Sequence, residues 1–219
     1  MAKPSEVKNL RLKAAKILRV LKKLFPNPKM QLRYSGNWEL LVSVILSAQC
    51  TDKKVNEVTS KLFKKYKRFD DYLRVSRKEF EKDIKPTGFY HSKTKNILAA
   101  AKIIKEKFKG RLPKTMEEML IIPGVGRKTA NVVLWNAYRV VSGIAVDTHV
   151  RRLARLLGLT KENNPEKIEK DLMEIVPKKD WPYLTYALIQ YGREYCPARP
   201  HNHDKCPLSR GTQTMNRRT

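Results

Sequence analysis

Cysteine is scarce in this chain, with three among 219 residues. Three cysteines in a reducing compartment argue against a disulfide framework. The sequence also lacks an apolar run long enough to span a bilayer, so we expect no membrane association. Its basic start, MAKPSEVKNLRLKAAK, has no apolar core of the kind that a secretion signal needs. These absences predict a cytoplasmic protein.

Acidic residues are also scarce relative to basic ones. The chain carries 47 lysines and arginines against 21 aspartates and glutamates, which gives a formal net charge of +26. Such an excess repels itself in the folded state, and binding to a polyanion with release of counterions would offset it. A lysine-rich surface typical of heat-adapted proteins is the alternative, but such surfaces normally carry matching acids. The charge therefore predicts a nucleic-acid partner and a nucleoid-associated protein.

Strand patterns, internal repeats and low-complexity linkers are missing as well. Apolar side chains recur at helical spacing instead, and the segment 37–49 is apolar nearly all round, which indicates a buried central helix. Side chains suited to capping mark the expected helix starts, namely Thr51, Ser76, Ser92, Thr115, Asp147 and Asn164. The sequence thus predicts an all-α protein of roughly ten short helices.

The segment LIIPGVGRKTANVVL, residues 120–134, predicts two helices joined by a tight turn. Glycines in that turn let the backbone approach a ligand, and the N–H groups that open the second helix carry the positive end of its dipole. Such a turn can hold a DNA phosphate without reading sequence. An ordinary helical hairpin is the alternative, and the net charge of +26 disfavours it. The residues assigned to DNA binding are Gly124, Val125, Gly126, Arg127 and Thr129.

Lys128 follows Arg127 at the start of that second helix. The neighbouring like charge and the helix N-terminus both disfavour the protonated amine, so Lys128 is a candidate nucleophile. On these grounds alone, a solvated lysine that contacts phosphate is the simpler alternative. Asp147 follows the apolar residues GIAV and begins the next helix, either as an ordinary cap or as a carboxylate presented to a site.

Five segments carry a more specific signal: LSAQCTD, GFYHSKTKNI, IPGVGRKTANVVL, AVDTHVRRLARLLG and YGREYCPAR. Their order and separation resemble endonuclease III, a family of DNA glycosylases in the helix-hairpin-helix superfamily, over about residues 10–206. The resemblance implies a two-lobed helical fold. One lobe, a six-helix barrel with the hairpin, covers residues 30–140. Residues 1–29 and 141–210 form a second lobe with a degenerate cluster loop, and residues 211–219 form a flexible tail.

The resemblance also implies a chemistry. The family excises oxidised pyrimidines such as thymine glycol from duplex DNA and then cuts the abasic site by β-elimination. Lys128 matches the lysine that attacks C1′ and forms a Schiff base, and Asp147 matches the aspartate that stabilises the cationic sugar or assists proton transfer. Relatives that only cleave the glycosidic bond lack this lysine. The sequence therefore predicts a bifunctional glycosylase and AP lyase that acts as a monomer on damaged double-stranded DNA.

Extrusion of a base leaves a gap in the duplex and costs a few kcal/mol. By resemblance, Gln49 fills the vacated space and Phe89 is the intercalating wedge, with a core aromatic at Phe89 as an equal alternative. His91 in the same segment is a further DNA contact. Asp52 and His149 are assigned to the pocket for the damaged base.

Two other functions stay open from the sequence. A mismatch-directed thymine or uracil glycosylase differs in pocket shape, which the sequence does not expose. A non-catalytic, structure-specific DNA-binding protein would need neither Lys128 nor Asp147.

The segment CPARPHNHDKCPLSRGT, residues 196–212, resembles the 4Fe–4S loop of the family with part of its ligand set replaced. The family pattern is Cys-x6-Cys-x2-Cys-x5-Cys, and its four positions are Cys196, His203, Cys206 and Thr212 here. Because a cubane cluster normally needs four cysteines, we expect no iron–sulfur cluster. Zinc bound by Cys196, His203 and Cys206, with His201 as a further candidate, is chemically allowed. We nevertheless expect a loop without metal or other cofactor, held by packing and hydrogen bonds.

Overall fold

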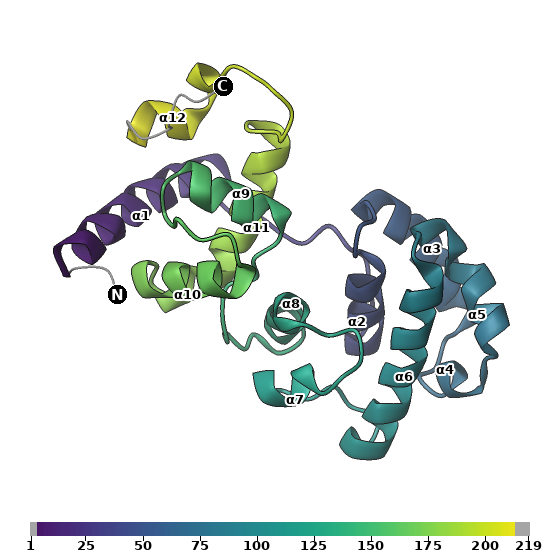
Figure 1. Ribbon diagram of the computed structural model, residues 1–219. Helices are drawn as coiled ribbons and strands as arrows, with labels where there is room; N and C mark the ends of the chain where they lie inside the picture. Colours follow the sequence, from purple (N-terminus) through teal and green to yellow (C-terminus); the bar gives the residue numbers. More distant parts are fainter. Residues whose placement is uncertain (1–3, 213–219) are drawn as a thin grey trace. The chain divides into compact units, whose positions relative to one another are not determined.

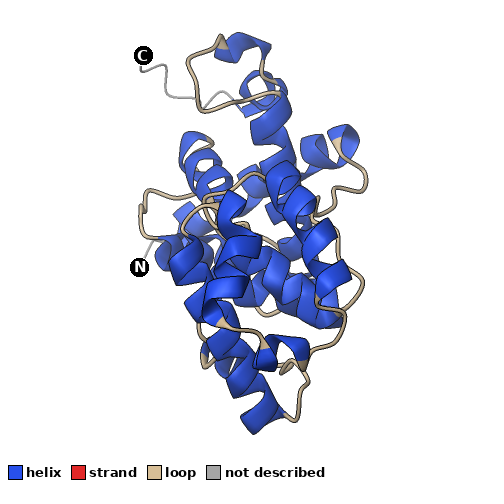
Figure 2. Ribbon diagram, turned by 90° about the vertical axis from the view of Figure 1, so that its right-hand side faces the viewer, coloured by secondary structure: helices blue, strands red, loops and turns tan. Residues whose placement is uncertain are grey.

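The computed structural model describes residues 4–212, and every regular element in that range is a helix (Figure 2), which confirms the predicted all-α class. The α-helices are α1 (Pro4–Leu24), α2 (Asn37–Leu46), α3 (Asp52–Lys65), α4 (Asp71–Arg74), α5 (Arg77–Ile84), α6 (Tyr90–Phe108), α7 (Met116–Leu120), α8 (Arg127–Tyr138), α9 (Thr148–Leu156), α10 (Pro165–Ile175), α11 (Trp181–Glu194) and α12 (Pro207–Thr212). The short 3-10 helices are η1 (Lys85–Thr87), η2 (Lys178–Asp180) and η3 (His203–Lys205). None of these helices is long and apolar enough to cross a membrane.

The chain divides into two compact units whose helices can be followed in Figure 1. The central unit is continuous from Gln31 to Ser142 and contains α2 to α8. The terminal unit joins the N-terminal segment through Met30 to the segment from Gly143 onward, and it contains α1 and α9 to α12. Of the tail predicted at 211–219, residues 211–212 belong to α12 and the remainder lies outside the described residues.

The core of the central unit is built around α2. Every residue from Leu40 to Leu46 is buried, which confirms the central helix predicted from its apolar sequence. Helices α3, α6 and α8 pack against it. Because burying a Leu, Ile or Val side chain contributes about 1.5–3 kcal/mol, the six buried apolar residues of this helix contribute substantially to the stability of the unit.

The core of the terminal unit is built on one face of α1. Ala14, Ile17, Leu18 and Leu21 form the buried stripe of this helix, which packs against α10, α11 and α12. The core continues along the chain to its last described helix and includes Leu153, Leu172, Leu188, Cys196, Cys206 and Leu208. The loop that contains Cys196 and Cys206, together with Leu208, is therefore part of the hydrophobic core of this unit.

Five of the six predicted capping side chains open helices in the expected way. Those of Thr51, Ser76, Thr115, Asp147 and Asn164 each accept a hydrogen bond from a backbone N–H in the following turn. The prediction for Ser92 is wrong, because α6 already begins at Tyr90. The chain enters α6 through Gly88 and Phe89, both with positive φ, and this sharp reversal needs no capping side chain.

Candidate functional site

The predicted hairpin is formed by α7, a tight turn and α8 in the central unit. Gly124 has φ of +80°, and the N–H of Val125 donates to the carbonyl of Ile122 at 3.1 Å. A Cβ added at Gly124 would lie 2.8 Å from the Cβ of Asn96 on α6, which is closer than real Cβ atoms approach. Glycine is therefore required at position 124 both by the backbone conformation and by the close packing of the turn on α6.

Lys128 is the second residue of α8 and is exposed to solvent. The cap residue, Gly126, has no side chain to occupy the N-terminus of the helix. The first N–H groups of a helix have no partner within it and carry the positive end of its dipole. The hairpin thus places an accessible primary amine beside a helix terminus that attracts anions.

Asp147 begins α9 in the terminal unit. Its Oδ1 accepts a hydrogen bond from the backbone N–H of Val150 at 2.8 Å, so the capping role considered from the sequence is present. Capping uses this one oxygen of the carboxylate, and the side chain is only half-buried. A capping role and an electrostatic role are therefore compatible in the same group.

Gln49 and Phe89 share an unusual backbone conformation. Both are exposed, and their φ angles are 52° and 47°, in the left-handed region that non-glycine residues avoid at a cost of about 1–3 kcal/mol. Lys109 and Arg139 also have positive φ, but they end α6 and α8, where this conformation is ordinary. Phe89 is 65% exposed, which rules out the core aromatic considered from the sequence.

Lys93 is a residue that the sequence reasoning missed. Its side chain is buried, and its Nζ donates to the carbonyls of Leu46 and Thr87, both at 2.8 Å. Leu46 ends α2 and leads into the turn of Gln49, whereas Thr87 immediately precedes Gly88 and Phe89. One ammonium group therefore ties together the two segments that carry the predicted insertion residues. Burial lowers the pKa of Lys93.

The sequence does contain an indication that Lys93 is buried. It lies four residues before Ile97, on the apolar stripe of α6, where a charged residue is out of place unless its charge has a buried partner. Asn96, one turn further along, packs under Gly124 of the hairpin. Helix α6 thus supports the segments that carry Gln49 and Phe89 through Lys93, and the hairpin through Asn96.

The remaining predicted site residues fall in both units. His91 is exposed in α6, and its Nδ1 lies 3.0 Å from Oε1 of Glu81. The pKa of Glu81 is lowered mainly by its side-chain hydrogen bond with His91 and next by the one with Arg77. Asp52 is the first residue of α3 in the central unit. His149, in α9 of the terminal unit, packs so closely on Gly192 that a Cβ there would lie 2.6 Å from its Nδ1.

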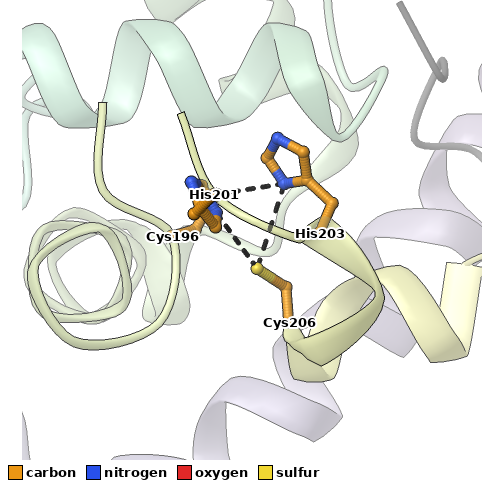
Figure 3. A group of neighbouring side chains, drawn as sticks. All are labelled: Cys196, His201, His203 and Cys206. Carbon is orange, nitrogen blue, oxygen red and sulfur yellow. Dashed lines mark hydrogen bonds between the residues drawn. The ribbon is translucent and has the colours of Figure 1, made fainter. Parts of the chain in front are cut away.

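The C-terminal loop brings four metal-ligating side chains together (Figure 3). One ligand atom from each of Cys196, His201, His203 and Cys206 lies within 4.8 Å of all the others. The expectation that this loop holds no metal is therefore not confirmed, since the group could bind an ion. The sequence pattern placed His203 at a cluster position but gave His201 only a subsidiary role.

The sequence and the fold of this chain match those of known proteins. The family described as "HhH-GPD superfamily base excision DNA repair protein" matches residues 42–178. An endonuclease III from Synechocystis sp. is 46% identical over 197 residues, covering 90% of each chain. A non-covalent endonuclease III–DNA complex has a TM-score of 0.88 at 39% identity, covering 93% of this chain and 95% of that one. A trapped endonuclease III–DNA covalent intermediate has a TM-score of 0.84 at 37% identity, covering 96% of both chains.

The hairpin, the helical fold and the matched region make this chain a member of the HhH-GPD superfamily of base excision DNA repair proteins. Within that superfamily it belongs to the endonuclease III family, which confirms the resemblance drawn from its sequence motifs.

Proposed function

We propose that Lys128 and Asp147 carry the chemistry of this chain and that its substrates are oxidised pyrimidines of the thymine glycol type. As an endonuclease III family member, the chain is a DNA glycosylase of base excision repair with AP lyase activity. The observation that carries the residue assignment is the exposed amine of Lys128 at the start of α8, within the hairpin. A covalent intermediate with DNA has been trapped for an endonuclease III that is 37% identical, which supports a nucleophilic mechanism.

The proposed reaction uses the amine of Lys128 as nucleophile and the carboxylate of Asp147 as anion. The neutral Nζ of Lys128 attacks C1′ of the extruded nucleotide, the N-glycosidic bond breaks, and the base leaves with its bonding electrons. Asp147 stabilises the positive charge that develops on the sugar. The nitrogen then loses a proton and the C1′–O4′ bond of the sugar ring opens, with O4′ taking up a proton, which gives a Schiff base between Nζ and C1′. Loss of a C2′ proton breaks the C3′–O bond, and the 3′ phosphate leaves with its bonding electrons. Water finally hydrolyses the Schiff base and releases the lysine.

Damaged double-stranded DNA is the partner in this proposal, bound by a monomer. The hairpin N–H groups hold a phosphate, while Gln49 and Phe89 enter the duplex and His91 makes a further contact. Asp52 and His149 contribute to recognition of the extruded base. Because its substrate is the chromosome, we place the protein in the cytoplasm with the nucleoid.

We also propose that the chain works without an iron–sulfur cluster. Only Cys196 and Cys206 are thiolate donors in the loop, and the other two family positions are His203 and Thr212. A cubane cluster takes four thiolates, so this donor set does not fit it.

Borohydride trapping on a thymine-glycol duplex tests the role of Lys128. The unmodified chain should yield a covalent adduct, and Lys128→Ala should abolish both adduct and strand cutting while DNA affinity stays within about tenfold, because the other phosphate contacts remain. Lys102→Ala, which removes an exposed lysine from α6, is the matched control and should trap normally. An adduct of undiminished yield in Lys128→Ala would refute the assignment.

Asp147→Asn completes the test. Asparagine caps helices as well as aspartate does, so α9 should keep its stability while the charge is lost. Base excision should slow more than strand cutting at a preformed abasic site. Equal slowing of the two steps would contradict the role assigned to Asp147.

A further inference from the structure

We propose that the loop after α11 is a structural zinc site, with Cys196, His201, His203 and Cys206 as its four ligands. The inference rests on the geometry of the loop and is independent of the glycosylase mechanism. Both sulfurs are fully buried and both imidazoles are half-buried, and Figure 3 shows the four side chains turned toward one another.

Three sulfur–nitrogen separations among the donor atoms fit tetrahedral zinc. Zn–S bonds of about 2.3 Å and Zn–N bonds of about 2.0–2.1 Å place a sulfur and a nitrogen about 3.6 Å apart across a tetrahedron edge. Sγ of Cys206 lies 3.4 Å from Nε2 of His201 and 3.9 Å from Nδ1 of His203. Sγ of Cys196 lies 3.9 Å from the same Nδ1 of His203. Each of these separations is within a few tenths of an ångström of a tetrahedron edge.

Contacts around the ligands orient them for this role. Nδ1 of His201 lies 2.9 Å from the carbonyl of Arg199, and a hydrogen bond from Nδ1–H to that carbonyl leaves the Nε2 lone pair free for a metal. Arg152 of α9 contacts both the Sγ and the carbonyl of Cys196, with Nη1 3.7 Å from the sulfur. Two thiolates and Zn²⁺ cancel in charge, so the buried site would be neutral overall.

The donor set selects zinc over the alternatives. Two thiolates and two imidazoles are a common structural zinc set, whereas an iron–sulfur cubane takes four thiolates. Four protein ligands leave no open position, so the ion would be structural and would not activate water. It would join the end of α11 to the start of α12, which packs against α1.

Metal analysis of the full chain, purified without chelator and without a polyhistidine tag, tests the proposal. We expect about one zinc ion per chain and iron well below stoichiometric amounts. Removal of zinc should lower the midpoint of thermal unfolding by about 5 °C or more, and added zinc should restore it. Stoichiometric iron, or a chain that takes up no zinc when it is supplied, would overturn the proposal.

Matched variants locate the site. Cys206→Ser should lose the zinc, whereas Cys50→Ser, which removes the third cysteine from outside the loop, should keep it. If Cys206→Ser does not fold, the absorption spectrum of the unmodified chain with Co²⁺ in place of zinc tests the site instead. Tetrahedral coordination by sulfur and nitrogen gives Co²⁺ intense visible bands and a thiolate charge-transfer absorption. Weak octahedral bands would contradict the assignment. Metal content is measured in the absence of DNA, so the test of the zinc site does not depend on catalysis. A chain that contains zinc but forms no borohydride adduct would refute the proposed role of Lys128 and leave the zinc site standing.

Discussion

Phe89 combines two features that folding alone does not favour. Its ring is exposed to solvent, and its backbone is held in the left-handed region directly before α6. Each feature carries a cost, because exposure forgoes the burial energy of an aromatic ring and positive φ strains a residue with a Cβ. Such costs persist where a residue acts on something outside the fold, and an aromatic wedge for unstacked bases meets that description.

Phe89→Ala should therefore impair function without impairing the fold. We expect the free energy of unfolding to change by less than about 0.5 kcal/mol, because the ring is exposed. Base excision under single-turnover conditions should slow by about tenfold, since the stacking energy that compensates base extrusion is lost. Phe89→Leu keeps an apolar wedge and should retain most of the rate. A variant with alanine that excises at the normal rate would show that the ring does not enter the duplex.

At the scale of elements, α6 is the support of the site in the central unit. Its first turn follows Phe89, Lys93 joins the ends of α2 and η1, and Asn96 packs under the hairpin turn. The segments that carry Gln49 and Phe89 and the turn of the hairpin are irregular in structure. Without these contacts to α6, their positions would depend on their own short turns. Anchoring them to one helix preserves their spacing.

Lys93→Met tests this support. Methionine keeps the aliphatic volume of the lysine but leaves the carbonyls of Leu46 and Thr87 without their charged donor, which should destabilise the fold by about 2–3 kcal/mol in urea titrations. Lys95→Met, an exposed substitution two residues away, should change neither stability nor rate. At a temperature where both variants are fully folded, base excision should still be slower in Lys93→Met. An unchanged rate there would limit Lys93 to a purely stabilising role.

The elements were largely predictable from sequence because their signals are local. The capping side chains of Thr51, Ser76, Thr115 and Asn164, and the apolar run of α2, act over one or two helical turns. The start of α6 was not predictable in this way, because it depends on a backbone reversal at Gly88 and Phe89. Contacts such as the one from Lys93 to Leu46 join residues far apart in sequence, and no local pattern encodes them.

The loop that contains Cys196, His201, His203 and Cys206 was also only partly predictable, although its residues are close together in the sequence. The sequence shows two cysteines and two histidines that could bind a metal, but it does not show that all four side chains meet. That the imidazole of His201 faces Cys206 depends on how the chain turns between them, and the hydrogen bond to the carbonyl of Arg199 contributes to that orientation.

At the scale of the whole molecule, the feature with the clearest consequence for DNA binding is the net charge of +26. Even if every acid paired with one basic residue, 26 of the 47 lysines and arginines would have no acidic counterpart in the chain, since it contains 21 acids. A charge excess of this size should make binding to undamaged duplex strong at low salt and weak at high salt, through release of counterions.

Affinity for an undamaged duplex, measured against salt concentration, tests this expectation. We expect the logarithm of the association constant to fall with the logarithm of salt with a slope that corresponds to about six or more phosphates. Lys128→Ala should reduce that slope by no more than about one, because it removes a single charge. A slope that corresponds to fewer than about two phosphates would show that the basic residues are not spread along the DNA.

The terminal unit draws on both ends of the chain, and this imposes an order on folding during synthesis. The apolar face of α1 is synthesised before its packing partners α10, α11 and α12, the first of which begins at Pro165, more than a hundred residues later. At about 5–20 residues per second this interval lasts roughly 7–28 s, during which synthesis of the continuous central unit is completed. During that interval Ile17, Leu18 and Leu21 form an unsatisfied apolar stripe. We therefore expect this stripe to be a binding segment for nascent-chain chaperones until α10 to α12 have been synthesised.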